Sequence, residues 1–155
     1  MEAIRSQAGA AGTVMNNLSA LGVGILFAFG VTGQDGYAWQ LRRLLQELGC
    51  HTEGLVACGD LITPVYVKPV DRGRQGLSAE HSRYDIRNRH ATPEKVTRDV
   101  LEQVERQLPA LDALNIVDQI ENERCEPVTP LVREWSRPGK SMRDRAVFKA
   151  RLRDM

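Results

Sequence analysis

Four consecutive small residues, followed by two hydrogen-bonding side chains, form the first stretch of the chain with the chemistry to hold a ligand. Residues 9–12 read Gly-Ala-Ala-Gly, and Thr13 and Asn17 follow them. Small residues let a ligand approach the backbone closely, and residues four apart lie on one side of a helix. The pattern indicates a binding turn at a helix start. The alternative is that the small residues only allow tight helix–sheet packing, with Thr13 as the cap.

A second glycine-rich stretch, GVTGQDG at residues 30–36, follows an apolar run. A strand that leads through glycines into a helix often binds phosphate, because free N–H groups and the helix dipole point toward the ligand. The stretch contains neither GxGxxG nor GxxxxGK[ST], the two nucleotide-binding patterns. Asp35 would also repel a phosphate, so we predict that it caps the helix that follows.

The elements that must position these residues alternate between helices and strands. Apolar periodicity predicts a helix over residues 13–21, closed by Gly22, and an amphipathic helix over residues 37–48, closed by Gly49. Between them, residues 25–31 (ILFAFGV) have the continuous apolar character of a strand in a parallel sheet. This order predicts an α/β fold with parallel strands connected by helices.

A small β excursion interrupts this order at residues 54–87. It contains a predicted strand at residues 63–69, a polar loop at 71–79 and a short strand at 82–86. Prolines at both ends of the first of these strands are typical of an edge strand or a flap outside the main sheet.

Two threonine–proline pairs, Thr92-Pro93 and Thr129-Pro130, are predicted to begin helices, with Thr as the N-cap and Pro as the first helical residue. Between these helices, residues 113–117 (ALNIV) form a predicted strand that ends at Asp118. Residues 137–155 carry 7 Lys or Arg and 2 Asp or Glu, a local net charge of +5, and we interpret them as an appended basic tail.

The composition of the 155 residues suits one soluble domain and argues against several function classes. A net charge of +1 does not suit general binding of polyanions. Cys50, Cys58 and Cys125 show no CxxC spacing, which is typical of buried thiols in a reducing cytosol. A metal site at Cys50, His51 and Cys58 would lack a fourth ligand. Because no apolar run is long enough to span a bilayer, we expect a cytoplasmic protein without a membrane partner.

Several segments resemble one enzyme family. The run AGAAGTVMNNLSALGVG, followed by FGVTGQDGYAWQLRRLLQELGCHTEGLV, resembles the N-terminal signature region of the PfkB (ribokinase-like) carbohydrate kinases. TPVYVKPV is similar to the β flap that closes over the sugar in that family, and SRYDIRN and ALNIVDQIENERCEPVTPLVRE are similar to later segments of its sugar lobe. These segments occur in the family's order over residues 8–136, and the heptose-7-phosphate kinase-like group is the branch they resemble most.

The resemblance implies a Rossmann-like (ribokinase-like) parallel sheet with flanking helices and a β flap. Residues 1–136 would form a partial carbohydrate kinase domain with its flap at about residues 54–87, and residues 137–155 the basic tail. The implied substrate is a sugar or a sugar phosphate, and the implied cofactors are ATP and Mg²⁺. Gly9 and Ala10 occupy the sugar-contacting turn of the family, Thr13 stands where the family commonly has an Asn, and Asn17 follows on the same helix.

Acidic residues late in the matched region are further candidates. Asp118 lies at the end of a strand, where α/β sheets place ligand groups, although it could equally cap a loop. Glu121 is a second candidate of this kind. The family's catalytic base lies in a G-A-G-D-like motif, which does not occur in this sequence. We therefore expect no catalytic residue and no metal ligand here, and interpret the chain as an N-terminal portion of a kinase that does not phosphorylate alone.

Two other function classes remain open. The strand at residues 63–68 could pair with another copy by edge addition, which would make the chain a homodimer or a non-enzymatic assembly module. Nucleic-acid phosphates could be contacted by the basic tail residues Arg143, Arg145, Lys149, Arg151 and Arg153. Because Phe148 is the only aromatic residue of the tail, base stacking has little support, and we do not expect a nucleic-acid partner.

Overall fold

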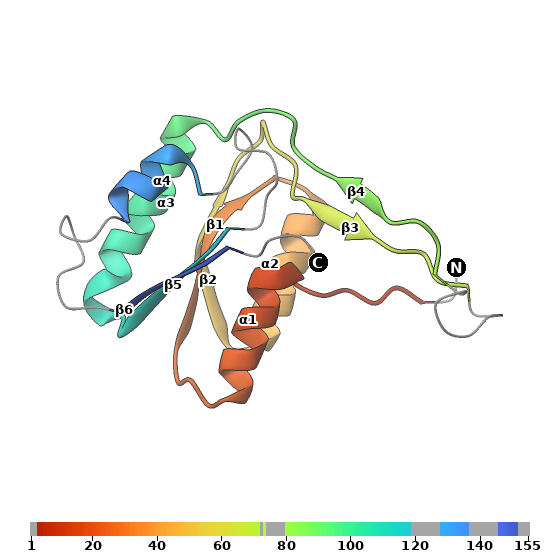
Figure 1. The fold of residues 1–155 in the computed structure, drawn as a ribbon, viewed down its shortest axis with the longest axis horizontal. Helices are drawn as coiled ribbons and strands as arrows, with labels where there is room; N and C mark the ends of the chain where they lie inside the picture. Colours follow the sequence, from red (N-terminus) through yellow and green to blue (C-terminus); the bar gives the residue numbers. More distant parts are fainter. Residues whose placement is uncertain (1–2, 72, 74–79, 119–127, 137–145, 152–155) are drawn as a thin grey trace.

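The computed structural model describes residues 3–71, 73, 80–118, 128–136 and 146–151. Within these ranges the chain is a mixed α/β protein, in which helices flank a small parallel sheet of two strands (Figure 1). A second parallel pair and an antiparallel hairpin complete the described strands. The predicted α/β class with a parallel sheet and flanking helices is therefore confirmed, and the Rossmann-like arrangement stays a prediction.

The main sheet is the parallel pair of β1 (Leu26–Thr32) and β2 (Cys50–Ala57). Helices α1 (Gly9–Ala20) and α2 (Gly36–Glu47) lie on one side of it, and α3 (Glu94–Gln107) lies on the other (Figure 1). With helices on both sides, β1 can be apolar at consecutive positions, which is the signal that predicted this strand.

The core lies between the main sheet and the helices α1 and α2. Ala28, Leu45 and Cys50 are buried there, each at most 4% exposed. Partly buried apolar residues pack around them: Ala8, Met15, Leu26, Leu41 and Leu55. The apolar stripe that predicted α2 thus faces the sheet as amphipathic periodicity requires.

Helix α2 confirms its prediction at both ends. The Asp35 carboxylate accepts a hydrogen bond from the Ala38 N–H at 2.8 Å, which is the predicted N-cap. At the other end, Gly49 has a φ of +76° and its N–H donates to the Gln46 carbonyl at 2.9 Å. A residue with a side chain rarely adopts this backbone conformation, so glycine ends the helix as expected.

Strand β2 was not predicted, and the expected start of the flap at residue 54 falls inside it. Its first five residues alternate between buried and exposed, but the buried positions Thr52 and Gly54 are not apolar. Because two of the buried positions are not apolar, the residue types of β2 do not show the apolar–polar alternation by which a strand is predicted.

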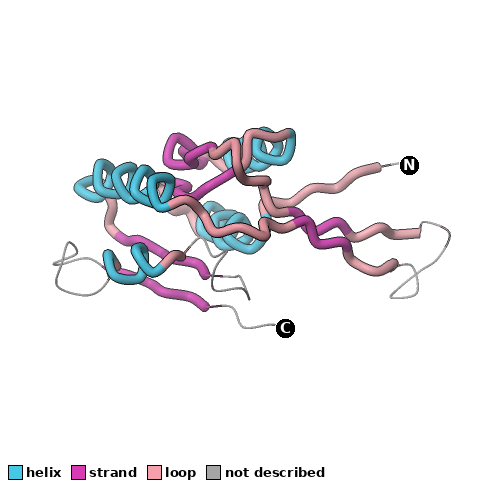
Figure 2. The backbone as a smooth tube through the Cα atoms, turned by 90° about the horizontal axis from the view of Figure 1, so that it is seen from above, coloured by secondary structure: helices cyan, strands magenta, loops and turns pink. Residues whose placement is uncertain are grey.

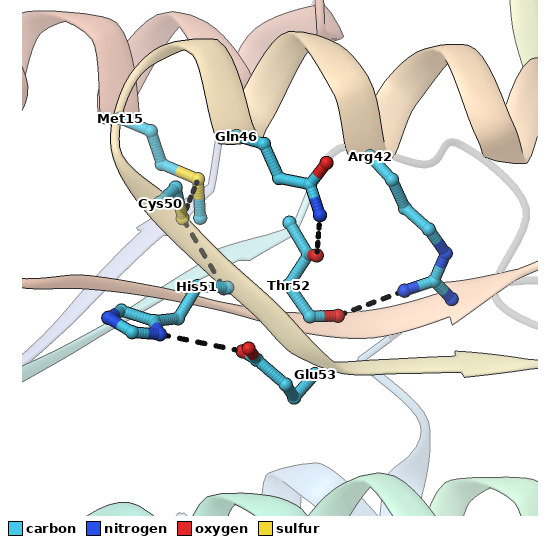
Figure 3. A network of polar contacts seen from close by, with 7 residues as sticks. All are labelled: Met15, Arg42, Gln46, Cys50, His51, Thr52 and Glu53. Carbon is cyan, nitrogen blue, oxygen red and sulfur yellow. Dashed lines mark hydrogen bonds and ion pairs between the residues drawn. The ribbon is translucent and has the colours of Figure 1, made fainter.

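An irregularity in β2 ties this strand to α2. Phe27 pairs with His51 whereas Phe29 pairs with Gly54, so β2 contains one extra residue, as in a β-bulge. The Arg42 guanidinium donates at 2.9 Å to the carbonyl oxygen of Thr52, which lies within the bulge (Figure 3). It also donates at 2.7 Å to the carbonyl oxygen of Leu55, just after the bulge. A single side chain of α2 thus satisfies backbone acceptors near the irregular point of the sheet.

Of the two predicted threonine caps in the second half of the chain, one is wrong and one is confirmed. Helix α3 begins at Glu94, and Pro93, with a ψ of 137°, is its N-cap, so the prediction that Thr92 caps this helix is wrong. Helix α4 (Pro130–Trp135) confirms its prediction, because the Thr129 hydroxyl accepts from the Val132 N–H at 3.4 Å.

The third strand pair corrects the interpretation of the basic tail. After the 3₁₀ helix η2 (Leu108–Ala110), β5 (Ala113–Asp118) follows as predicted. It pairs in parallel with β6 (Ala146–Arg151), so this part of the presumed tail is a strand. Phe148, Lys149 and Arg151 belong to β6, whereas Arg143, Arg145 and Arg153 lie outside the described residues.

The flap is an antiparallel hairpin of β3 (Val65–Val67) and β4 (Tyr84–Ile86), which confirms both predicted strands. A single bridge between Val70 and Glu80 extends the pairing toward the tip. The hairpin projects to one side of the helices, in the same direction as the segment that precedes α1 (Figures 1 and 2).

Replacement of Gly54 tests the packing at the bulge. A Cβ atom at this position would lie 2.4 Å from the Phe29 ring and 2.6 Å from the Ala28 carbonyl oxygen. Since neither neighbour can move freely, we expect Gly54→Ala to lower the free energy of unfolding by about 1–3 kcal/mol in urea titrations. Gly36→Ala is the matched control, because no atom lies within 4 Å of an added Cβ there. Equal stability of the two variants would contradict the packing argument.

Candidate functional site

The first turn of α1 carries the residues that were predicted to contact a ligand. The helix begins at Gly9, four residues earlier than expected, so residues 9–12 are helical rather than a turn before a helix. Ala8 is the N-cap and offers no side-chain acceptor. The first intrahelical bond runs from the Gly12 N–H to the Ala8 carbonyl, at 3.2 Å. By helix geometry, the N–H groups of residues 9–11 precede this bond and can donate outward.

Two different physical causes explain why glycine stands at positions 9 and 12. Gly9 has a φ of +66°, a conformation that glycine adopts without strain. Gly12 is buried, and a Cβ atom there would lie 2.2 Å from the Cβ of Ala8. Close packing therefore accounts for Gly12, which is the alternative given above for the small residues. It does not account for Gly9, which is exposed and has no atom within 4 Å of an added Cβ.

Three of the predicted contact residues form a row. Gly9, Thr13 and Asn17 are four residues apart along α1, and all three are exposed. Thr13 does not cap the helix: its hydroxyl donates to the Gly9 carbonyl at 3.0 Å and keeps its oxygen as an acceptor. Ala10, half-buried, lies beside Gly9. The structure thus brings together the four candidates of the N-terminal region.

Asp118, the remaining predicted contact residue of the described ranges, belongs to a different part of the fold from this row. It is the last residue of β5, opposite Arg151 of β6, in a sheet that does not include β1 or β2. Its predicted place at the carboxyl end of a strand is confirmed. Its strand pairs with β6, however, and not with β1, the strand that follows α1. Glu121 lies outside the described residues.

A polar junction holds the end of β1, the start of α2 and the root of the flap together. One oxygen of Asp35 accepts from the Ala38 N–H, and the other accepts from the Thr63 N–H, both at 2.8 Å. The Thr63 hydroxyl accepts from the Gly33 N–H at 3.0 Å. Burial of the carboxylate opposes ionisation, but the hydrogen bonds from Thr63 and Ala38 outweigh it, so the pKa of Asp35 lies below its ordinary value.

The two ends of the flap are joined by Asn88. Its side-chain amide donates to the Ile62 carbonyl at 2.8 Å, and its oxygen accepts from the Ile62 N–H at 2.9 Å. The sequence analysis missed both Asn88 and the junction role of Thr63. No local signal could have identified either residue, because the partners of Thr63 lie 28 and 30 residues away and that of Asn88 lies 26 residues away.

The flap has two different faces, because pairing in β3 and β4 places opposite residues on the same side. Val65 pairs with Ile86 and Val67 pairs with Tyr84, which makes one face apolar. Tyr66 pairs with Asp85 on the other face.

The second face of the flap is charged and internally paired. Asp85 contacts Arg83 at 2.6 Å and Arg87 at 2.5 Å, and the Arg83 guanidinium lies 4.6 Å from the centre of the Tyr66 ring. Desolvation opposes ionisation of Asp85, but the hydrogen bonds and charges of Arg83 and Arg87 outweigh it and lower its pKa. Much of the charge on this face is therefore compensated within the flap.

The region around Cys50 has no sign of a metal or thiol site (Figure 3). Cys50 is buried against Met15, with 3.8 Å between the two sulfur atoms, and His51 instead contacts Glu53 at 3.7 Å. Burial, with a smaller contribution from the charge of Glu53, raises the pKa of the Cys50 thiol and disfavours the reactive thiolate. No three His, Cys, Asp or Glu residues of the described ranges gather closely enough to hold a metal ion. Cys58 is buried as well, and Cys125 lies outside these ranges.

No model of a protein family matches the chain, and a search of curated proteins finds no significant match. Among the helices in the described part of the chain, none is both long enough and apolar enough to cross a membrane.

Removal of the Asp35 carboxylate tests the junction. We expect Asp35→Ala to lower the free energy of unfolding at pH 7 by about 1–3 kcal/mol, because a helix cap and the hydrogen bond from Thr63 are lost. Since the folded-state pKa of Asp35 is lowered, its stabilising effect is present above about pH 4, the unfolded value, and is lost as the pH falls further. The difference between wild type and variant should therefore shrink as the pH falls below about 4.

The control for this experiment is Asp60→Ala, since Asp60 is exposed in the loop after β2. Urea unfolding of the three proteins across the pH range gives the required differences. A wild-type-to-Asp35→Ala difference that is independent of pH, or an equal loss in the Asp60 variant, would contradict the role of the carboxylate.

Proposed function

We propose that the chain forms part of the sugar-binding lobe of an ATP-dependent carbohydrate kinase of the PfkB type, with a sugar or a sugar phosphate as substrate. The observation that supports this proposal most is the exposed row of Gly9, Thr13 and Asn17 at the open start of α1. Backbone N–H groups of the first turn, together with a hydroxyl and an amide, supply donors and acceptors that suit the hydroxyl groups of a sugar.

The order of elements supports the same proposal. α1, β1, α2 and β2 follow one another, and the antiparallel flap comes next along the chain. The start of α1 lies toward the side from which the flap projects (Figures 1 and 2). A hairpin rooted on the start of α2 by Asp35 and Thr63 has a fixed base from which to cover a ligand near α1.

ATP and Mg²⁺ are the implied cofactors of such a kinase, in which one or two carboxylates and the phosphates of the nucleotide usually hold the metal ion. Among the described residues, no group of three or more acidic, His or Cys side chains forms a metal site made of protein groups alone. The sequence also contains neither nucleotide-binding glycine pattern. We therefore derive no catalytic step through ATP and restrict the proposal to sugar binding.

The chain alone should show no phosphotransferase activity. Phosphoryl transfer needs a positioned base near the acceptor hydroxyl and groups that stabilise the transferred charge, and the sequence contains no G-A-G-D-like motif to supply them. Incubation with ATP, Mg²⁺ and a panel of sugars and sugar phosphates should yield no ADP above background, with a complete sugar kinase as the positive control. Robust turnover would overturn the assignment of this chain as catalytically incomplete.

Sugar binding should depend on the row of residues on α1. In calorimetric titrations with free sugars and sugar phosphates, we expect Asn17→Ala to weaken binding about tenfold, the effect of about 1.4 kcal/mol from a lost hydrogen bond. Asn16→Ala is the matched control, because Asn16 is also exposed on α1 but stands outside the row. Absence of saturable binding to the wild type, or equal weakening in both variants, would sink the proposal.

A second candidate function, an assembly module that dimerises through the flap, is favoured by one observation. The apolar face of the hairpin is open: Tyr84 is 62% exposed, Val67 38% and Ile86 36%. An isolated two-stranded hairpin is marginally stable, so a partner on this face would stabilise it. The other face compensates its charge through Asp85, which reduces repulsion between two copies of the chain.

Substitution at the apolar face tests dimerisation. In sedimentation equilibrium, Tyr84→Ser should raise the dimer dissociation constant by about tenfold or more, because buried tyrosines often dominate interfaces. The control, Tyr66→Ser, removes a tyrosine that is 52% exposed on the opposite face of the hairpin and should leave the constant nearly unchanged. A strictly monomeric wild type at high concentration would rule out this second function without affecting the sugar-binding proposal.

A further inference from the structure

We draw no further inference here: the strongest candidate, the exposed apolar turn of residues 21–25 between α1 and β1, carries none because nothing in the structure shows what covers it.

Discussion

The way in which β1, α2 and the flap meet depends on the two oxygen atoms of Asp35. One caps α2 and the other holds Thr63 at the root of the flap, while the Thr63 hydroxyl accepts from Gly33 at the end of β1. Gly33 has no room for a side chain, since an added Cβ would lie 2.4 Å from the carboxylate. The same contacts explain why this glycine-rich turn is structural. Its acid is already paired with backbone N–H groups, and those groups are not left for a phosphate.

The bulge in β2 shows how local irregularity and helix packing depend on each other. An extra residue between His51 and Gly54 disturbs the regular pairing with β1. Arg42 reaches from α2 to the carbonyl oxygens of Thr52, within the bulge, and of Leu55, just after it. The Phe29 ring lies against Gly54. Burying an unpaired backbone carbonyl would be costly. A long donor side chain on the covering helix therefore makes the bulge compatible with the fold.

Sequence patterns predicted elements whose signal is local and missed those whose signal is tertiary. Helix α2 was predicted with its cap because Asp35, the apolar stripe and Gly49 all lie within one short stretch. β2 was missed because Thr52 and Gly54 are buried for reasons of neighbouring contacts rather than apolarity. The start of α1 was placed too late because glycine normally weakens a helix, whereas Gly12 is required there by its contact with Ala8. For the site, helical spacing predicted that Thr13 and Asn17 share one side of α1, whereas Gly9 was expected in a turn before the helix. The sheet to which Asp118 belongs is set by long-range pairing that no local pattern encodes.

The two proposed functions use different surfaces, so one does not exclude the other. The row on α1 offers polar groups from one helix, whereas association would use the apolar face of the flap. Both depend on the flap root, since Asp35, Thr63 and the Ile62–Asn88 pair fix where the hairpin leaves the body. A hairpin held only at its base can still bend along its length, because few apolar contacts support it. Contact of its apolar face with a second copy would restrict that motion and thereby fix the position of the hairpin relative to α2.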